Sequence, residues 1–399
     1  MKKLVLIFLI FISILNSQAQ QLNFSDSAKI SLITCSPGEE VYEKFGHTAI
    51  RINDKKTATD LVFNYGIFDF NTSNFYFKFI KGETDYQLGV YDTGNFLASY
   101  AMRNSLVWEQ IINLTVSEKR ILINNLLRNY EPENRTYRYN FVFDNCATRP
   151  RDKIMSSTKG YIKFLANSEP KTYRQWIGSY IGSDTWLKFG IDLVFGIEAE
   201  HFASTSESMF LPEVLMSEFQ TAQIVIANGQ TKKLIVDKKI LINKHEATDI
   251  NSNSPFKPLT ITILILIIGS IITIWDIYQH RHSKLFDSIL FISTGILGII
   301  IAYLMFFSVQ PLVKQNLNIV WLNPLSLIVG ILIWFRRLRV AMFFYQILNI
   351  IFLVGGLFAF ALSIQSFNVA SFPIIVLLLM RSTSWFAYLK RRIYKHRSL

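Results

Sequence analysis

Residues 137–152 read YRYNFVFDNCATRPRD, and they decide the fold expected for the first half of the chain. Aromatic side chains at every second position of 137–143 predict a strand with one buried face. Asn145 has the side chain of a helix N-cap, which predicts a helix over residues 146–157. Cys146 then lies at a helix N-terminus, where amide N–H groups and the helix dipole favour a thiolate. The pattern therefore predicts a nucleophilic cysteine.

The chain contains only two cysteines, Cys35 and Cys146. In an exported protein such a pair can form a disulfide, which would leave no nucleophile. The position of Cys146 just after a capping residue, together with a candidate base upstream, favours the nucleophile. The Cys35–Cys146 disulfide stays open as the alternative.

Composition changes along the chain and predicts its domain order. Residues 1–19 combine two lysines, a short apolar run and small residues, the pattern of a signal peptide. Residues 20–247 mix polar and apolar side chains, as an exported globular domain does. Residues 248–258 are rich in Asn, Ser and Pro and predict a linker, and residues 259–399 form a transmembrane domain. The expected fold class is α+β for the exported domain and all-α for the membrane domain.

The membrane domain is expected to contain five spans, each long enough to cross a hydrocarbon core of about 30 Å. The predicted spans are residues 259–279, 285–308, 317–335, 341–362 and 369–388. Arg381 interrupts the last span, and its guanidinium group is expected to snorkel to the cytoplasmic side.

Basic residues flank these spans unevenly. They gather between the first and second spans, between the third and fourth, and after the fifth, while the two other loops hold only Lys314. The positive-inside rule places the basic clusters in the cytoplasm, which puts residues 20–247 in the periplasm and the C-terminus in the cytoplasm. The expected location is the bacterial inner membrane. Much of the net charge of +12 reflects this topology, so nucleic-acid binding is not expected.

Residues 45–70 predict a β-hairpin in which His47 begins the first strand. A thiolate nucleophile needs a base or imidazolium partner, and that partner needs a third polar group to orient it. His47 is the candidate base and Asn64 the candidate orienting residue. Tyr65 and Asp69 are alternatives to Asn64, because the sequence does not fix the register of the hairpin.

Cysteine–histidine chemistry of this form suits acyl transfer. The thiolate attacks an ester or amide carbonyl, and an amine or water resolves the thioester. Backbone N–H groups at the start of the Cys146 helix are expected to form the oxyanion hole. Asn145, Arg149 and Arg151 are the expected substrate-binding residues, because guanidinium groups can hold a lipid phosphate in bidentate fashion. The alternative is that both arginines pair with neighbouring acidic residues.

Periodicity predicts the other elements of the exported domain. Helices are expected over residues 95–102, 116–130, 173–180 and 203–219, a strand over 105–114, and a strand pair over 224–243. Residues 74–81 read NFYFKFIK. This aromatic and basic segment is either a surface that faces membrane or substrate, or a buried aromatic edge.

Four motifs in order carry a resemblance to a known family: TCSPGEEVYEKFGHTAIRI, LVFNYGIFDFNTSNFYFKFIKG, YRYNFVFDNCATRPRD and ESMFLPEVLM. Across residues 28–220 the sequence resembles the Lnb-type periplasmic domain of Bacteroidota proteins. The order of a histidine before an Asn-Cys pair is also similar to that of circularly permuted papain-like enzymes of the lecithin:retinol acyltransferase and NlpC/P60 type. The resemblance implies such a fold, with Cys146 as nucleophile and His47 as base.

The resemblance also implies a function. Lnb-type enzymes are associated with N-acylation of bacterial lipoproteins, in which an acyl chain moves from a lipid ester to the α-amino group of the N-terminal cysteine. The expected partners are therefore lipoproteins and membrane lipids, with no cofactor and no metal. One alternative is a cell-wall peptidase or amidase of the NlpC/P60 type that uses the same site. The other is a non-catalytic membrane scaffold with a Cys35–Cys146 disulfide.

Overall fold

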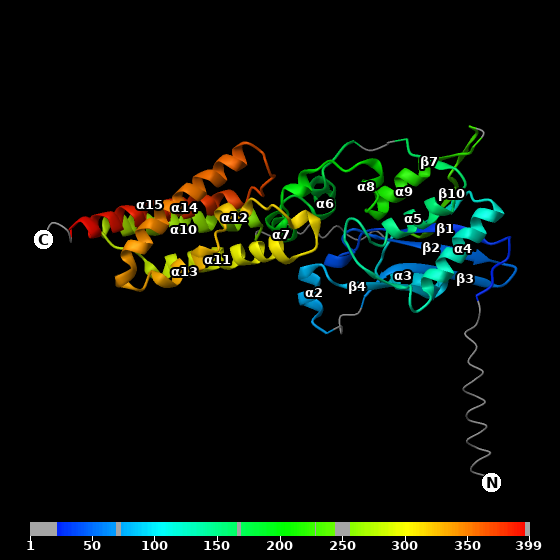
Figure 1. The fold of residues 1–399 in the computed structure, drawn as a ribbon, viewed down its shortest axis with the longest axis horizontal. Helices are drawn as coiled ribbons and strands as arrows, with labels where there is room; N and C mark the ends of the chain where they lie inside the picture. The colour runs from blue at the N-terminus through cyan, green and yellow to red at the C-terminus, as the bar shows by residue number, and fades with distance from the viewer. Residues whose placement is uncertain (1–21, 69–72, 166–168, 228, 244–255, 396–399) are drawn as a thin grey trace, which may run out of the picture.

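The structure, a computed structural model, describes residues 22–68, 73–165, 169–227, 229–243 and 256–395. The predicted signal peptide and most of the predicted linker lie outside these residues. The described chain forms two parts along the long axis of the molecule, a sheet-rich part followed by a bundle of long helices (Figure 1).

An antiparallel sheet of seven strands forms the centre of the first part, in the order β10-β5-β1-β2-β3-β4-β6. Its strands are β1 Lys29–Cys35, β2 His47–Asp54, β3 Thr59–Ile67, β4 Asp85–Asp92, β5 Val107–Ile112, β6 Thr136–Arg138 and β10 Ile235–Ile242. A second sheet contains β7 Tyr161–Lys163, β8 Gln223–Val225 and β9 Thr231–Lys233. Strand β1 is buried from its second residue onward, because helices cover both faces of the large sheet.

The helices of the first part are α2 Phe75–Lys81, α3 Thr93–Met102, α4 Val116–Tyr130, α5 Thr148–Ser157, α6 Tyr173–Ile181, α7 Trp186–Val194, α8 Thr205–Ser208, α9 Pro212–Thr221, and the 3₁₀ helices η1 Val41–Glu43 and η2 Ile197–Glu200. On one face of the sheet, α4, α5 and α9 share a core with Leu32, Ile50 and Phe63. On the other face, α3 packs against Ile33 and Val62. The sheet is therefore the middle layer of three.

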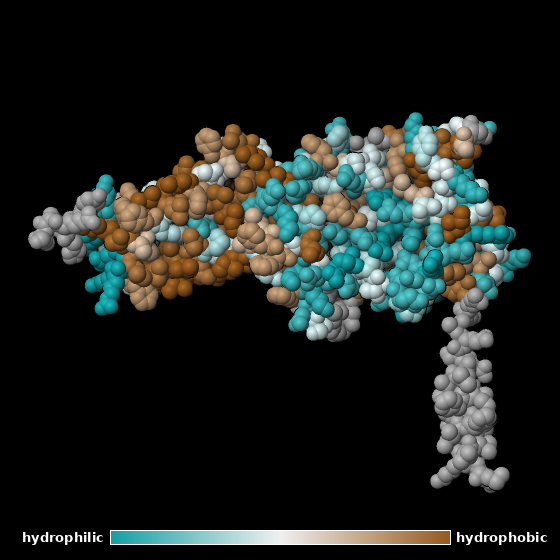
Figure 2. Space-filling view, in the orientation of Figure 1, coloured by the Kyte–Doolittle hydropathy of each residue, from teal (hydrophilic) through white to brown (hydrophobic). Residues whose placement is uncertain are grey.

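The second part contains α10 Pro258–Tyr278, α11 Lys284–Phe307, η3 Pro311–Val313, α12 Asn318–Trp321, α13 Leu325–Leu332, η4 Arg336–Leu338, α14 Arg339–Ala361 and α15 Ser371–Lys395. Among the described residues, five segments are long and apolar enough to cross a membrane, which agrees with the predicted number of spans. Hydrophobic side chains cover this part, whereas the sheet-rich part is mostly hydrophilic (Figure 2). The third span is not one helix, because Pro324 separates α12 from α13.

A buried polar network joins the two parts. Arg174 of α6 pairs with Asp192 of α7 at 3.0 Å and with Glu200 of η2 at 2.6 Å. Glu200 in turn accepts a hydrogen bond from Ser366, and Asp192 accepts one from Asn368, both in the loop before α15. These charge-assisted bonds hold the sheet in a fixed orientation over the helix bundle.

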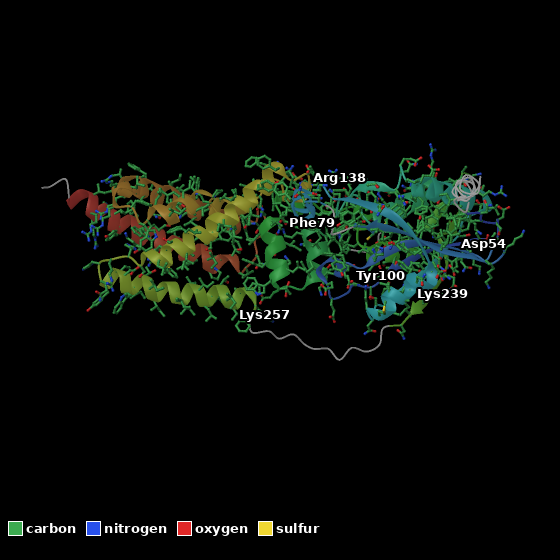
Figure 3. The ribbon with its side chains drawn as sticks, turned by 90° about the horizontal axis from the view of Figure 1, so that it is seen from below. Asp54, Phe79, Tyr100, Arg138, Lys239 and Lys257 are labelled. Atoms are coloured by element: carbon green, nitrogen blue, oxygen red, sulfur yellow. The ribbon has the colours of Figure 1, made fainter. Side chains whose placement is uncertain are left out.

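That orientation turns one end of the sheet toward the membrane helices. In Figure 3, Phe79 and Tyr100 lie on the membrane side of the sheet-rich part, and Asp54 lies at its far end. In the pairing of β1 with β2, Cys35 lies opposite His47. Because Tyr100 packs on His47, with ring centroids 6.2 Å apart, this pair belongs to the membrane-facing end.

The predicted strand over residues 137–143 is wrong beyond Arg138, where β6 ends. The side-chain oxygen of Asn140 accepts hydrogen bonds from the backbone N–H groups of Val142 and Phe143, and Asn140 also forms an isolated bridge with Asp144. These local bonds close a tight turn, which competes with an extended strand.

Two other predictions change in detail. The helix expected over 203–219 is divided into α8 and α9, because Pro212 has no backbone N–H and begins a new helix. The strand pair expected over 224–243 forms as β8 and β9, but most of its second half, β10, joins the large sheet beside β5. The hairpin of β2 and β3, the strand β5 and the helices α3, α4 and α6 are confirmed.

Candidate active site

Three chain segments meet at the membrane-facing end of the sheet. Strand β2 begins with His47, β3 carries Asn64 and Gly66, and the turn before α5 carries Cys146. A Cβ atom placed on Gly66 would lie 3.4 Å from Cβ of Cys146 and 3.8 Å from Cε1 of His47. The fold therefore brings together three residues that are far apart in the sequence, His47, Asn64 and Cys146.

Asn64 contacts His47 directly. Its Oδ1 atom lies 2.5 Å from Nε2 of His47. Because an amide oxygen only accepts hydrogen bonds, Nε2 carries the proton and Nδ1 is the ring nitrogen left for Cys146. Of the alternatives to Asn64, Tyr65 bonds through its hydroxyl group to Asn129 at 2.8 Å on the other face, and Asp69 lies outside the described residues.

The surroundings of Cys146 favour a thiolate. The pKa of its thiol responds to the charge and hydrogen bond of the His47 side chain and to the backbone N–H groups of Thr48 and of Cys146 itself. Burial alone would raise the pKa of the thiol, but the charge and hydrogen bond of His47, with these N–H groups, lower that pKa below its ordinary value.

The pKa of His47 shifts in the opposite direction, upward. Burial disfavours its charged form, yet the Cys146 thiolate and the hydrogen bonds to Cys146 and Asn64 raise the pKa of the imidazole above its ordinary value. The two groups thus stabilise each other as a thiolate–imidazolium pair, which is the form that a cysteine nucleophile requires.

The side chain of Asn145 stabilises the turn before α5. Its side-chain oxygen accepts the backbone N–H groups of Ala147 and Thr148, and its side-chain nitrogen donates to the carbonyl oxygens of Phe141 and Phe210. The amides of Ala147 and Thr148 are therefore occupied, and of the N–H groups at the start of the helix that of Cys146 itself stays a candidate for the predicted oxyanion hole. The backbone N–H groups of Thr48 and Cys146, which lower the pKa of the thiol, are the candidates for this role.

The two arginines after the nucleophile have partners within the chain. Arg149 makes a bidentate pair with Asp144, with distances of 2.6 and 2.8 Å, and its guanidinium group lies 3.5 Å from the ring centre of Tyr137. Arg151 pairs with Asp152 at 2.7 Å. These contacts agree with the alternative that both arginines pair with neighbouring acidic residues, and not with the expectation that they bind a lipid phosphate.

Cys35 and Cys146 are both free thiols. Cys35 is buried under α3, and burial raises its pKa well above the ordinary value. The disulfide of the scaffold alternative is thus not present in this structure, and the pKa values of the two thiols shift in opposite directions, down for Cys146 and up for Cys35.

Two protein-family models match the chain. The Lnb N-terminal periplasmic domain matches residues 17–178, and the Lnb transmembrane domain matches residues 249–392. The chain belongs to the Lnb family. No curated protein and no solved structure matches it. Family membership confirms the resemblance drawn from the four motifs and the order of a periplasmic α+β domain before an apolar membrane region of five helices. The papain-like arrangement stays a prediction.

Three residues of the Lnb periplasmic domain were missed by sequence reasoning. Thr48 contributes a backbone N–H group, which leaves no trace in residue type. Tyr100 packs on His47 from α3, and nothing in its segment indicates this contact. Gly66 did leave a signal, since a glycine inside a strand often marks a close approach of another group. Its φ of 95° and its contact with Cys146 agree with that rule.

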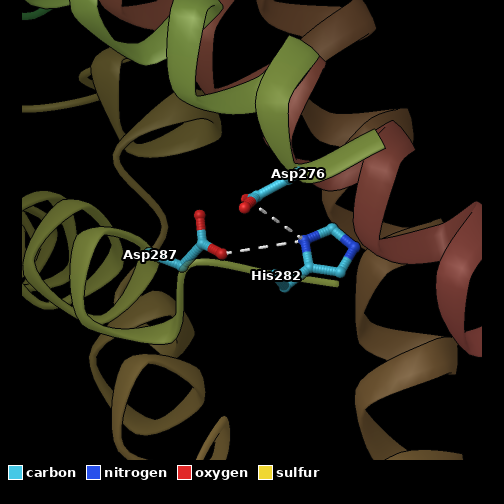
Figure 4. Close-up of side chains that lie close together, drawn as sticks. All are labelled: Asp276, His282 and Asp287. Atoms are coloured by element: carbon cyan, nitrogen blue, oxygen red, sulfur yellow. Dashed lines mark ion pairs between the residues drawn. The ribbon is translucent and has the colours of Figure 1, made fainter. Parts of the chain in front are cut away.

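Among the described residues, one cluster of potential metal ligands lies in the Lnb transmembrane domain. It comprises Asp276, His282 and Asp287, whose ligand atoms all lie within 4.8 Å of one another (Figure 4). Arg381 of α15 lies against the same carboxylates, and its Nη2 atom is 2.7 Å from an oxygen of both Asp276 and Asp287. The guanidinium group of Arg381 supplies the positive charge that a metal ion would bring. We therefore interpret the cluster of Asp276, His282 and Asp287 as part of a structural ion pair with Arg381 rather than as a metal site.

The expected snorkelling of Arg381 is therefore wrong. Its side chain is fully buried and makes a bidentate pair with Asp287, at 2.6 and 2.7 Å, in addition to its contact with Asp276. Thr273 accepts a further hydrogen bond from Nη1 at 3.0 Å. The pair ties α15 to α10 and α11, because within an apolar bundle a charge is tolerated only with such partners.

We expect Arg381→Met to destabilise the membrane domain by about 3–5 kcal/mol, because it leaves two buried carboxylates without their cation. The measurement is the thermal unfolding of the full chain in detergent. Arg337→Met is the matched control, since Arg337 is exposed and should change the midpoint little. Equal midpoints for the two variants would contradict the assignment.

Proposed function

We propose that this protein is a membrane-anchored, thiol-dependent acyltransferase. It moves an acyl chain from a lipid ester, through a thioester on Cys146, to the N-terminal amine of lipoproteins. The observation that carries the proposal is the hydrogen-bonded group of Cys146, His47 and Asn64 at the membrane-facing end of the sheet. The lowered thiol pKa supplies a nucleophile, and the location gives access to esters at the bilayer surface. The Lnb resemblance supplies the reaction, lipoprotein N-acylation.

The first half-reaction breaks the lipid ester. The Cys146 thiolate attacks the ester carbonyl carbon, and the backbone N–H groups of Thr48 and Cys146 donate to the oxyanion that forms. When the C–O bond breaks, the His47 imidazolium gives its proton to the leaving alcohol oxygen. The products are an acyl thioester on Cys146, a neutral His47 and a lysolipid.

The second half-reaction forms the amide. The neutral α-amino group of the lipoprotein attacks the thioester carbonyl, and His47 accepts the proton that the nitrogen loses. The C–S bond breaks, and the thiolate–imidazolium pair returns. His47 thus alternates between acid and base, which is why its hydrogen bond to Asn64 matters in both halves.

The arrangement of these residues supports a permuted papain-like fold for the periplasmic domain. In the proposed arrangement, the histidine lies on a strand that precedes the cysteine in the chain, and the cysteine leads into a helix packed on the same sheet. Here β2 carries His47, and Cys146 precedes α5, which shares the core beneath β1, β2 and β3.

We also infer the topology from the charges. The sheet-rich part lies in the periplasm, and the C-terminus lies on the cytoplasmic side of the inner membrane. Hydrophilic side chains reappear at the end of the bundle remote from the sheet (Figure 2), as the positive-inside rule requires of the cytoplasmic side. Residues 1–19 as signal peptide and residues 248–258 as linker complete this proposal.

Mass spectrometry of lipoprotein N-termini tests the proposed function in cells that carry the wild type or Cys146→Ser. The proposal predicts that the N-acyl group disappears in the variant while the amount of the protein in the membrane is unchanged. Unchanged N-termini, in cells without a second N-acylating enzyme, would rule the function out. Muropeptide release that depends on Cys146 would instead indicate a cell-wall peptidase.

Asn64→Ala is expected to lower kcat about 10²-fold with a smaller effect on KM, because the His47 ring loses the group that orients it. The measurement is transfer from a phospholipid to a synthetic diacylated lipopeptide by the purified full chain. Asn124→Ala, at an exposed position of α4, is the control. If kcat of Asn64→Ala stays within a factor of about two of the wild type, the orienting role is wrong.

A further inference from the structure

The short helix α2 connects the periplasmic domain to the surface of the membrane bundle. The carbonyl oxygen of Lys81, its last residue, accepts hydrogen bonds from Val309 N at 2.8 Å and from Ser308 Oγ at 3.2 Å, just past the end of α11. The ring of Phe77 lies 6.0 Å from the ring of Tyr303 in the last turns of α11. Helix α2 is therefore held at the level where α11 leaves the apolar part of the bundle.

Large apolar side chains of α2 are exposed at this level. Phe77, Phe79 and Ile80 have exposed fractions of 57%, 56% and 47%. Phe306 and Phe307 at the end of α11 are also exposed, so the apolar surface of the membrane span continues onto α2. An exposed apolar patch of this size in continuity with a membrane surface indicates contact with lipid.

A second group of exposed apolar side chains adjoins the active site. Val41 and Tyr42 of η1 are exposed, and the Tyr42 ring lies 6.4 Å from the ring of Phe68. Phe68 follows the end of β3, two residues after Gly66, which approaches Cys146. A run of aromatic side chains thus extends from the exposed surface to the strand that lines the nucleophile.

We propose that α2, with Val41 and Tyr42, inserts into the adjacent leaflet of the same bilayer and forms the route by which a lipid acyl chain reaches Cys146. The occupant is bilayer lipid at the depth of the headgroups and upper acyl chains. Aromatic side chains with Lys78 and Lys81 on one short helix match that zone, because the rings enter the acyl region while the ammonium groups stay near the phosphates. The route rests on the proposed function, and the membrane contact does not.

The membrane contact is tested without turnover. Nitroxide labels are placed by Phe77→Cys or Phe79→Cys in the full chain with Cys35 and Cys146 replaced by serine, in nanodiscs of phosphatidylethanolamine and phosphatidylglycerol. Collisions with oxygen report lipid, and collisions with a water-soluble nickel complex report solvent. We expect higher oxygen and lower nickel accessibility than for Ile121→Cys, an exposed position on α4 at the far end of the domain. Equal accessibility at all three positions would overturn the contact.

The route is tested by reactivity at Cys146. The double variant Phe77→Asp/Phe79→Asp is expected to react with iodoacetamide at the wild-type rate, because the nucleophile is intact, but to form thioester from vesicle phospholipid about tenfold more slowly. Ile121→Asp is the control. Equal thioester rates for variant and wild type would overturn the route. If the wild type itself forms no thioester, the proposed function fails and the route with it, while the nitroxide result still decides the membrane contact.

Discussion

Cys146→Ala is expected to abolish transfer of acyl chains to lipoprotein N-termini, with a loss of roughly 10⁴-fold or more in kcat, because the other described thiol beside His47, that of Cys35, is buried and has a raised pKa. The fold should survive, since the substitution removes one sulfur atom from a half-buried position. The measurement is single-turnover transfer from a phospholipid to a synthetic lipopeptide by the purified full chain.

Cys35→Ala is the matched control for that experiment. Cys35 lies opposite His47 in the sheet but is buried and has a raised pKa, so its loss should leave transfer close to the wild-type rate. If both variants lost activity equally, the cysteines would act as a pair, as in a disulfide, and the nucleophile assignment would be wrong.

His47→Ala is expected to have an effect of similar size on transfer, and to change the pH dependence of Cys146 alkylation. In the wild type the lowered thiol pKa lets alkylation continue to a lower pH than an ordinary thiol allows, and alkylation is lost as the pH falls through that lowered value. Without the imidazolium, burial dominates and raises the pKa, so alkylation near pH 7 should fall and return only at alkaline pH.

The measurement is the rate of iodoacetamide labelling of Cys146 between pH 5 and pH 10, followed by peptide mass spectrometry. His201→Ala is the control, because His201 is an exposed histidine of the same domain and lies outside the active site. Superimposable profiles for His47→Ala and the wild type would show that His47 does not activate the thiol.

Local patterns in the sequence predicted most of the elements that hold the active site. The hairpin placed His47 at the start of β2 and the candidate Asn64 on the neighbouring strand, but only the folded chain shows that Asn64, rather than Tyr65, lies within reach of His47. The capping chemistry of Asn145 indicated a turn before a helix, although α5 begins only at Thr148. In each case residues close together in sequence decide the conformation.

Competing local bonds explain where the predictions failed. Asn140 binds two nearby backbone N–H groups, which ends the predicted strand early. Asn145 takes the amides of Ala147 and Thr148, which removes them from the expected oxyanion hole. Periodicity of apolar residues gives no information about such side-chain bonds to the backbone.

Contacts between segments that are distant along the chain could not be predicted from the sequence, for a different reason. Arg381 was expected to reach toward water, but its partners Asp276 and Asp287 lie about a hundred residues earlier, on other helices. The contact of Tyr100 with His47 is of the same kind. A single sequence does not state which helix packs beside which, so these pairings became visible only in the folded chain.

The most direct test of the central claim is to trap the thioester on Cys146. Full-length wild type is incubated with phospholipid in the absence of any amine acceptor, quenched with acid and analysed by peptide mass spectrometry. The account predicts one acyl chain on the peptide that contains Cys146, released by neutral hydroxylamine and transferred when a lipopeptide is added. Formation of N-acylated lipopeptide by a protein that never carries an acyl chain on Cys146 would contradict it.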